Sequence, residues 1–427
     1  MRIKEEKFLI DSSSLFEFQH PACECDLDEN HPSRGVKEYT FRIYPKQDEY
    51  VRFAYKGASG LIKLKDSGAI DGKPVLSELL AVQNEKPKAL KEFIEKFGFL
   101  LPLVAIDGNS AKAEVLFSII NRVKMTVGLM SELGEPQKDY DKILGLTLAL
   151  SFEEPVALEL AHYTNPFETC CHELFSIWNN VHPPSVVDFN DPSSSVFPIG
   201  SMSIKNSLGI EESSPCIFIP DTVRPPETAL DKEEIDAREF ERHNGTQRSK
   251  SEEFFDNVFY LFMNAHNVSP NCRLALDFLF HYCREVRGVE SWDNTGRLTA
   301  IKKRSFAASE SEDKLDDTLK DALIRFAKNT LKDEIEFNLM GVTPCYDVDT
   351  MTPSWEVDHL LTALYFSIFY MRPNLELYRL CANPNCGRYF LVKTTTAKQK
   401  YCETSCANAM AQRNHRLKAK AAKNSEK

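Results

Sequence analysis

The first apolar pattern along the chain is a strict alternation with polar residues, which is typical of β-strands with one buried face. It occurs in three runs, at residues 39–43, 51–56 and 62–65. The segments PKQDE and GASG that separate these runs are short, so we expect an antiparallel meander. The first 36 residues are polar and contain several turn signals, and we expect an irregular segment there.

From about residue 74 the pattern changes to a helical period. Leu90, Phe93, Ile94 and Phe97 have the i, i+3, i+4, i+7 spacing that places residues on one face of a helix. Further helical patterns cover residues 111–133, 138–163, 254–263, 274–280, 315–326 and 361–369. Between residues 181 and 250 the period is lost. Eight prolines and a run of serines indicate an insertion or linker there, with room for a strand at Cys216–Ile219.

Composition indicates a soluble globular protein of two or three domains, because the 427 residues are 42% hydrophobic and 27% charged. The longest apolar stretch, Leu360–Met371, is shorter than the ~18 to 20 residues of a membrane span. The N-terminal sequence MRIKEEKFLI lacks the apolar segment of a signal peptide. We therefore expect a cytoplasmic protein that does not enter a membrane.

Cysteine and charge are both unevenly distributed. Four of the 12 cysteines fall within 26 residues near the C-terminus, and in a reducing compartment such clusters indicate metal binding or catalysis. Residues 381–427 carry ten Lys/Arg and two Asp/Glu, whereas the whole chain has a net charge of −11. The chain therefore combines an acidic body with a basic, cysteine-rich C-terminal segment.

The four clustered cysteines are spaced as C-x4-C-x15-C-x3-C, which suits a closed tetrahedral Zn²⁺ site. The proposed zinc ligands are Cys381, Cys386, Cys402 and Cys406. Pro384 and Gly387 favour a tight turn around the metal. We expect residues 388–392 and 398–401 to form a hairpin, and the last two cysteines to lie on one face of a helix. A turn, a hairpin and a helix in this order predict a treble-clef finger.

This segment resembles the CGNR-type zinc finger of bacterial transcriptional regulators. The residues that match the family pattern are Cys381, Pro384, Cys386, Gly387, Phe390, Cys402, Cys406 and Asn408. Ala407 and Ala409 replace the Gly and Arg of the C-G-N-R signature, and Val392 replaces an acidic residue. The resemblance covers about 40 residues. It implies a DNA-binding finger joined to a ligand-sensing or stress-response domain.

A basic helix is expected after the last cysteine, and it suggests contacts with DNA phosphates. The candidate nucleic-acid-binding residues are Arg413, Arg416, Lys418 and Lys400. Two other roles for these cations remain open: they belong to a solvated tail, or they offset the negative charge of a zinc ion held by four thiolates. The finger can equally serve as a module for docking another protein.

Three other groups of residues are candidate sites. His20, Cys23, Cys25 and His31 lie in the polar N-terminal segment, where a disordered entry segment explains them better than a second metal. Cys170, Cys171 and His172, with His162 nearby, suggest a nucleophile, but buried inert thiols are the preferred interpretation.

The third group is Trp355, Glu356, Asp358 and His359, which Thr352 and Pro353 precede as an expected helix cap and first helical residue. This capping role requires no chemistry. The chain contains none of the common nucleotide-binding, metalloprotease or serine-hydrolase motifs, and we expect no enzyme.

The expected fold class is α+β, with a predominantly helical body, a small N-terminal antiparallel sheet and a C-terminal treble-clef zinc finger. The expected divisions are a β-rich part at residues 1–70, helical regions at 71–180 and 251–375 around the insertion at 181–250, the finger at 376–420 and a basic tail at 421–427. The leading function is a bacterial DNA-binding transcriptional regulator whose body senses a signal, forms a homodimer or binds a protein partner. The alternatives are a zinc-stabilised interaction module and, less favoured, an enzyme with an unrecognised site.

Overall fold

A computed structural model of the chain shows the mixed helix and sheet architecture that the sequence predicts. The structure describes residues 17–33, 36–55, 60–72, 74–83, 86–102, 110–158, 167–180, 202–205, 211–214, 258, 261–262, 265, 267–286, 289–292, 298–301, 317–348, 351–373, 376–386, 388–393 and 399–425. The chain divides into two compact units. Unit 1 comprises Met1–Lys138, Pro155–Cys170 and Leu331–Lys427, and unit 2 comprises Asp139–Glu154 and Cys171–Thr330.

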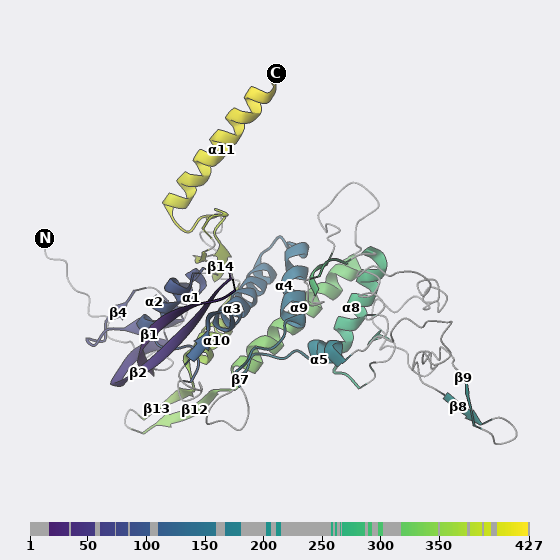
Figure 1. The fold of residues 1–427 in the computed structure, drawn as a ribbon, viewed down its shortest axis with the longest axis horizontal. Helices are drawn as coiled ribbons and strands as arrows, with labels where there is room; N and C mark the ends of the chain where they lie inside the picture. Colours follow the sequence, from purple (N-terminus) through teal and green to yellow (C-terminus); the bar gives the residue numbers. More distant parts are fainter. Residues whose placement is uncertain are drawn as a thin grey trace. The chain divides into compact units, whose positions relative to one another are not determined.

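Unit 1 contains a five-stranded antiparallel sheet in which two long strands lie side by side (Figure 1). The strands are β1 (Glu17–Ser33), β2 (Val36–Tyr55), β3 (Leu61–Leu64), β4 (Ile70–Asp71) and β5 (Ser110–Lys112). They are ordered β1-β2-β3-β4, and β5 pairs with β2. The predicted antiparallel pairing of residues 51–56 with 62–65 is confirmed, since Arg52 lies opposite Leu64.

Two details of this sheet differ from the sequence expectation. Most of the described part of the N-terminal segment forms strand β1 and is not irregular, and the inward positions of this strand include the buried His20, Cys23 and Cys25. Histidine and cysteine occupy positions where large apolar residues would have revealed the alternation. PKQDE is a bulge within β2 and not a hairpin loop, because the pairing register shifts between Pro21 and Cys23 while β2 continues.

Helices cover this sheet and form the main core of unit 1. They are α1 (Val75–Ala81), α2 (Pro87–Phe97), α3 (Ala113–Gly134) and α10 (Leu360–Phe369). The predicted face of α2 is confirmed, because Leu90, Phe93, Ile94 and Phe97 are all buried. Phe369, the last residue of the helical pattern predicted at 361–369, is 54% exposed although this pattern would bury it. One further helix, α11 (Thr404–Ser425), follows the cysteine cluster.

Unit 1 also contains three two-stranded elements. These are β6 (Ala157–Leu158) with β7 (Phe167–Glu168), β12 (Val342–Asp347) with β13 (Thr352–Val357), and β14 (Glu376–Leu380) with β15 (Tyr389–Lys393). The helix cap predicted at Thr352 and Pro353 is wrong, because both residues belong to β13. The helix begins later, and His359 is its N-cap residue.

A buried ion pair lies inside unit 1. Arg122 on α3 donates from Nε and Nη2 to the two carboxylate oxygens of Glu334, both at 2.8 Å. Tyr365 on α10 donates its hydroxyl to the same carboxylate at 2.9 Å. All three residues are at most 2% exposed, so the pair is fully withdrawn from water. Multiple hydrogen bonds offset the desolvation of such a pair.

The described part of unit 2 is mainly helical. Its elements are α4 (Tyr140–Phe152), α5 (Glu173–Asn180), α8 (Pro270–Val286), β8 (Met202–Lys205), β9 (Glu211–Ser214), β10 (Val289–Trp292) and β11 (Leu298–Ile301). The chain then continues into α9 (Asp317–Asn338). The helix predicted at residues 138–163 ends at Phe152, because Pro155 disfavours helical backbone in the residue before it.

The structure describes only some of the residues to which the remaining predictions for unit 2 apply. The strand expected at Cys216–Ile219 lies outside the described residues, as do most of residues 181–250. The helices predicted at residues 274–280 and 315–326 fall within α8 and α9, apart from residues 315 and 316, which are not described. Among the described helices, none combines the length and apolarity that a membrane span requires.

Candidate metal centre and basic helix

The first two cysteines lie in the turn that joins β14 to β15. Leu380 pairs with Tyr389 at the end of this hairpin, so the chain from Cys381 onward must reverse direction. Cys381 donates its backbone N–H to Arg388 O at 2.9 Å, and Cys386 donates to Asn383 O at 2.9 Å. These bonds fold the segment into a compact knuckle and hold both thiols on the same side.

The predicted hairpin between residues 388–392 and residues 398–401 is wrong. Residues 389–393 pair with β14, which precedes the first cysteine, and residues 399–401 form no strand. Instead, Lys400 accepts a single backbone hydrogen bond from Ala382 at 2.9 Å. This bond brings the segment before Cys402 against the knuckle, which lies between the two strands of the hairpin and not before them as predicted.

The second pair of cysteines lies at the start of α11. Cys406 occupies the first turn of the helix, whereas Cys402 precedes it by two residues. The expectation that both lie on the helix is therefore wrong for Cys402. Their sulfurs are nevertheless 3.7 Å apart, because the approach to the helix curves back toward the knuckle.

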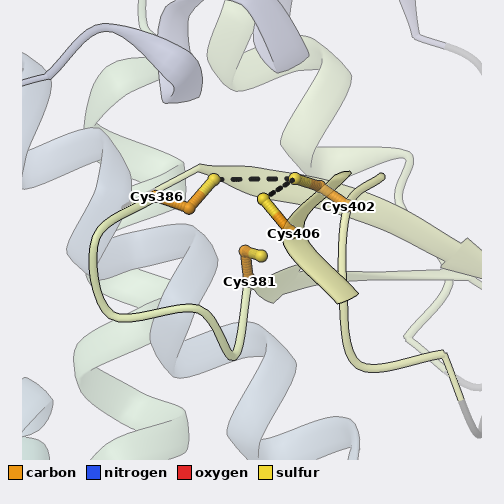
Figure 2. A group of neighbouring side chains, drawn as sticks. All are labelled: Cys381, Cys386, Cys402 and Cys406. Carbon is orange, nitrogen blue, oxygen red and sulfur yellow. Dashed lines mark hydrogen bonds between the residues drawn. The ribbon is translucent and has the colours of Figure 1, made fainter. Parts of the chain in front are cut away.

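The four thiols converge on one point, as Figure 2 shows. All four sulfur atoms lie within 4.8 Å of one another, and Cys386 Sγ is 3.6 Å from Cys402 Sγ. Ligands at ~2.3 Å from a tetrahedral zinc ion would be about 3.8 Å apart. The cluster thus has the size and the donor atoms of a four-thiolate metal site, and cysteines fill all four positions.

The surroundings shift the acidity of these thiols in different directions. Burial raises the pKa of Cys386 and of Cys402. A hydrogen bond with the Asn383 side chain lowers the pKa of Cys406. Since metal binding requires thiolates, a bound cation would supply the charge that stabilises the thiolates of Cys386 and Cys402.

The hairpin is anchored to unit 1 and is not tethered by a free linker. Gln83, just after α1, donates from Nε2 to the carbonyl oxygen of Cys386 at 2.9 Å. Tyr378 is 3% exposed in the main core, and its hydroxyl lies 2.9 Å from Ser77 Oγ. Arg379 pairs with Glu135 and also donates to Gln399 O at 3.2 Å. These contacts fix the position of the cysteine cluster relative to the sheet and helices of unit 1.

Sequence reasoning missed these anchoring residues. Gln83 lies about 300 residues before Cys386 in the chain, and no local pattern links the two. The one available signal was Gly134, where an added Cβ would lie 2.8 Å from Leu377. A glycine at the end of a long helix permits close approach of a neighbouring element.

The proposed nucleic-acid contacts lie on or near α11. Arg413 and Arg416 are exposed, as are all residues from 411 to 416. Lys400 is also exposed, beside the knuckle. Lys418 belongs to the same helix. No Asp or Glu occurs within α11, so the positive charge of the helix is not neutralised by its own residues.

The other candidate residues occupy structural positions. His20 donates from Nε2 to Phe99 O at 2.6 Å inside the core, while His31 is exposed and lies 3.4 Å from Glu29. Cys170 is buried, and burial raises the pKa of its thiol. Cys171 is half-buried, and its sulfur lies 3.1 Å from Ser176 Oγ. His162 lies outside the described residues.

Comparison with known proteins yields one result. No curated protein and no solved structure matches the chain. A family model described as CGNR zinc finger matches residues 378–419, which contain the four clustered cysteines and most of the basic helix. The C-terminal segment of the chain is therefore identified as a CGNR zinc finger, at the place where the cysteine spacing predicted one.

Proposed function

We propose that the protein is a bacterial, cytoplasmic transcription regulator that binds DNA through a zinc-loaded C-terminal finger. Cys381, Cys386, Cys402 and Cys406 would hold Zn²⁺ as a closed structural site. The ion would lock α11 onto the knuckle and would take no part in catalysis, because four cysteines leave no open position. We propose no enzymatic activity for the chain.

The single observation that carries the DNA proposal is the exposed basic surface of α11. Arg413 and Arg416 are exposed on a helix without acidic residues that starts at the metal ligands. A cationic helix on a small finger provides the electrostatic attraction that phosphate backbones require. Lys400 and Lys418 are the other proposed contacts, and the α+β body would sense the regulatory signal, form a homodimer or bind a partner.

The alternative is a zinc-stabilised module for protein docking. It is favoured by the anchoring of the hairpin in the body, where Tyr378 and Val392 are each 3% exposed. This anchoring suits a rigid protein-docking module as well as a DNA-binding finger. The alternative does not explain, however, why the exposed part of the finger is cationic while the chain as a whole is acidic.

A DNA-binding assay with and without metal tests the proposal. The zinc-loaded full chain should bind a fluorescent 20-base-pair duplex at low salt, and a chelator should abolish binding until zinc is restored. Cys402→Ser should behave like the chelated protein, and Cys345→Ser, at an exposed cysteine far from the cluster in sequence, is the matched control. Binding that survives both chelation and Cys402→Ser would contradict a zinc-organised DNA site.

A further inference from the structure

The helical register of α11 separates its cations into two groups. Successive residues of an α-helix are rotated by about 100°. Arg413, Arg416, Lys420 and Lys423 are separated by three, four and three residues, so they fall within an arc of about 80°. Lys418 lies on the opposite side of the helix, about 180° from the middle of this arc. We call the first four residues the basic face.

The described part of the basic face, Arg413 and Arg416, is exposed to solvent. Ser405 and Ala409 lie on the same arc in the first turns, and both are exposed. These small residues allow the helix backbone to approach a partner closely. From residue 413 to residue 423 the face extends about 15 Å at a rise of 1.5 Å per residue. This length spans several nucleotides of a strand, whose charges are spaced about 3.4 Å apart.

We infer that α11 enters the major groove of B-form DNA with this basic face directed at the phosphates and base edges. The inference rests on the proposed DNA-binding function and specifies its residues and its partner. It adds Lys420 and Lys423 to the contacts and removes Lys418, because Lys418 occupies the helical position opposite the basic face. A major groove about 12 Å wide admits a helix of this kind.

The same geometry distinguishes DNA from double-stranded RNA. The major groove of A-form RNA is deep and narrow, and side chains cannot read it. A single exposed helix with a charged face therefore fits B-form DNA and does not fit an RNA duplex. A diffuse electrostatic attraction would instead involve all the cations of α11 equally, irrespective of the face on which they lie.

Two lysines two residues apart provide a matched test. Lys420→Ala and Lys418→Ala each remove one positive charge from the same helix, and alanine preserves helix propensity. Binding of the zinc-loaded full chain to a 20-base-pair DNA duplex is followed by fluorescence anisotropy between 50 and 200 mM salt. Lys420→Ala should lower the slope of log K against log salt by ~0.9, as the loss of one phosphate contact does. Lys418→Ala should leave the slope unchanged.

Each other outcome has a distinct meaning. Equal slopes for the two variants, both below that of the wild type, would overturn the assignment of a contact face but leave DNA binding intact. Equal affinity for an RNA duplex of the same sequence would overturn insertion into the major groove. No binding of DNA by the wild-type protein at 50 mM salt would contradict the proposed function itself. Failure of the contact-face assignment and failure of the proposed function are therefore distinguishable.

Discussion

The side chain of Gln83 donates a hydrogen bond to the backbone carbonyl of Cys386, across a distance of 2.9 Å. This bond connects the end of α1, whose buried residues belong to the main core, with the knuckle that carries two of the four clustered thiols. The cysteine cluster is thus positioned partly by a residue outside the segment that matches the zinc-finger family.

Replacing Gln83 with alanine should loosen the knuckle. The lost hydrogen bond should lower the free energy of unfolding by about 1 kcal/mol and weaken zinc binding measurably. Competition with a chromogenic chelator measures the affinity. Gln47→Ala is the control, because Gln47 is exposed in the bulge of β2. Identical zinc affinities for the two variants would show that Gln83 does not organise the site.

The purified protein should contain one zinc ion per chain. The four sulfurs lie within 4.8 Å of one another, and a closed four-thiolate site binds a single ion. Cys402→Ser should lose most of this metal, whereas Cys345→Ser should keep it. Elemental analysis after extensive dialysis provides the measurement. Full occupancy in Cys402→Ser would mean that the metal is held elsewhere.

Tyr365→Phe should destabilise the protein although it changes neither volume nor charge appreciably. The hydroxyl donates to Glu334, and its loss removes one hydrogen bond from a carboxylate that is 0% exposed. A hydrogen bond to a charged group contributes about 1.5 to 3 kcal/mol. Urea denaturation provides the measurement, and Tyr44→Phe, at a tyrosine that is 41% exposed, should have no effect. A similar midpoint for both variants would contradict the stabilising role of the buried network.

Stability should fall as the pH decreases from about 6.5 to about 4. Burial lowers the pKa of His20 from 6.5 to about 4. Between these two pH values His20 is protonated in the unfolded chain and neutral in the folded chain. The contribution of His20 is fully present above pH 6.5 and is lost as the pH approaches the folded value. At the acid end the loss amounts to about 3 kcal/mol.

Thermal melts of His20→Gln at several pH values test this dependence. The variant should show a flatter decline between pH 6.5 and 4 than the wild type, even if it is less stable at neutral pH. His31→Gln is the control, since His31 is exposed on the same strand. A decline as steep in His20→Gln as in the wild type would assign the acid sensitivity to other groups, such as the buried His359, whose pKa is also lowered to about 4.

Local patterns predicted some elements well because the residues involved are ordinary ones. The apolar face of α2 consists of Leu, Phe and Ile at helical spacing, and it is buried as expected. The cysteine cluster was also predictable, because all its ligands lie in one short segment with a characteristic spacing. Strand β1 was not predictable, because His20, Cys23 and Cys25 at inward positions hide the alternation of apolar and polar residues along it.

Long-range relationships were beyond the reach of these patterns. The partner of β15 lies before the knuckle, and only the folded structure distinguishes this pairing from a hairpin with residues 398–401. The pairing of Arg122 with Glu334 joins residues 212 positions apart, and no local sequence pattern around either residue indicates the pair. Burial in a common core creates such pairs, and burial depends on the tertiary fold.

The salt dependence of DNA binding by a double variant, Arg413→Ala with Arg416→Ala, tests the central claim most directly. Both arginines are exposed and neither belongs to the cysteine cluster, so the variant should keep its zinc. It should bind every duplex more weakly than the wild type and flatten the slope of log K against log salt by up to about two units. Affinity and slope equal to those of the wild type, with zinc retained, would contradict DNA recognition by α11 and favour the protein-docking alternative.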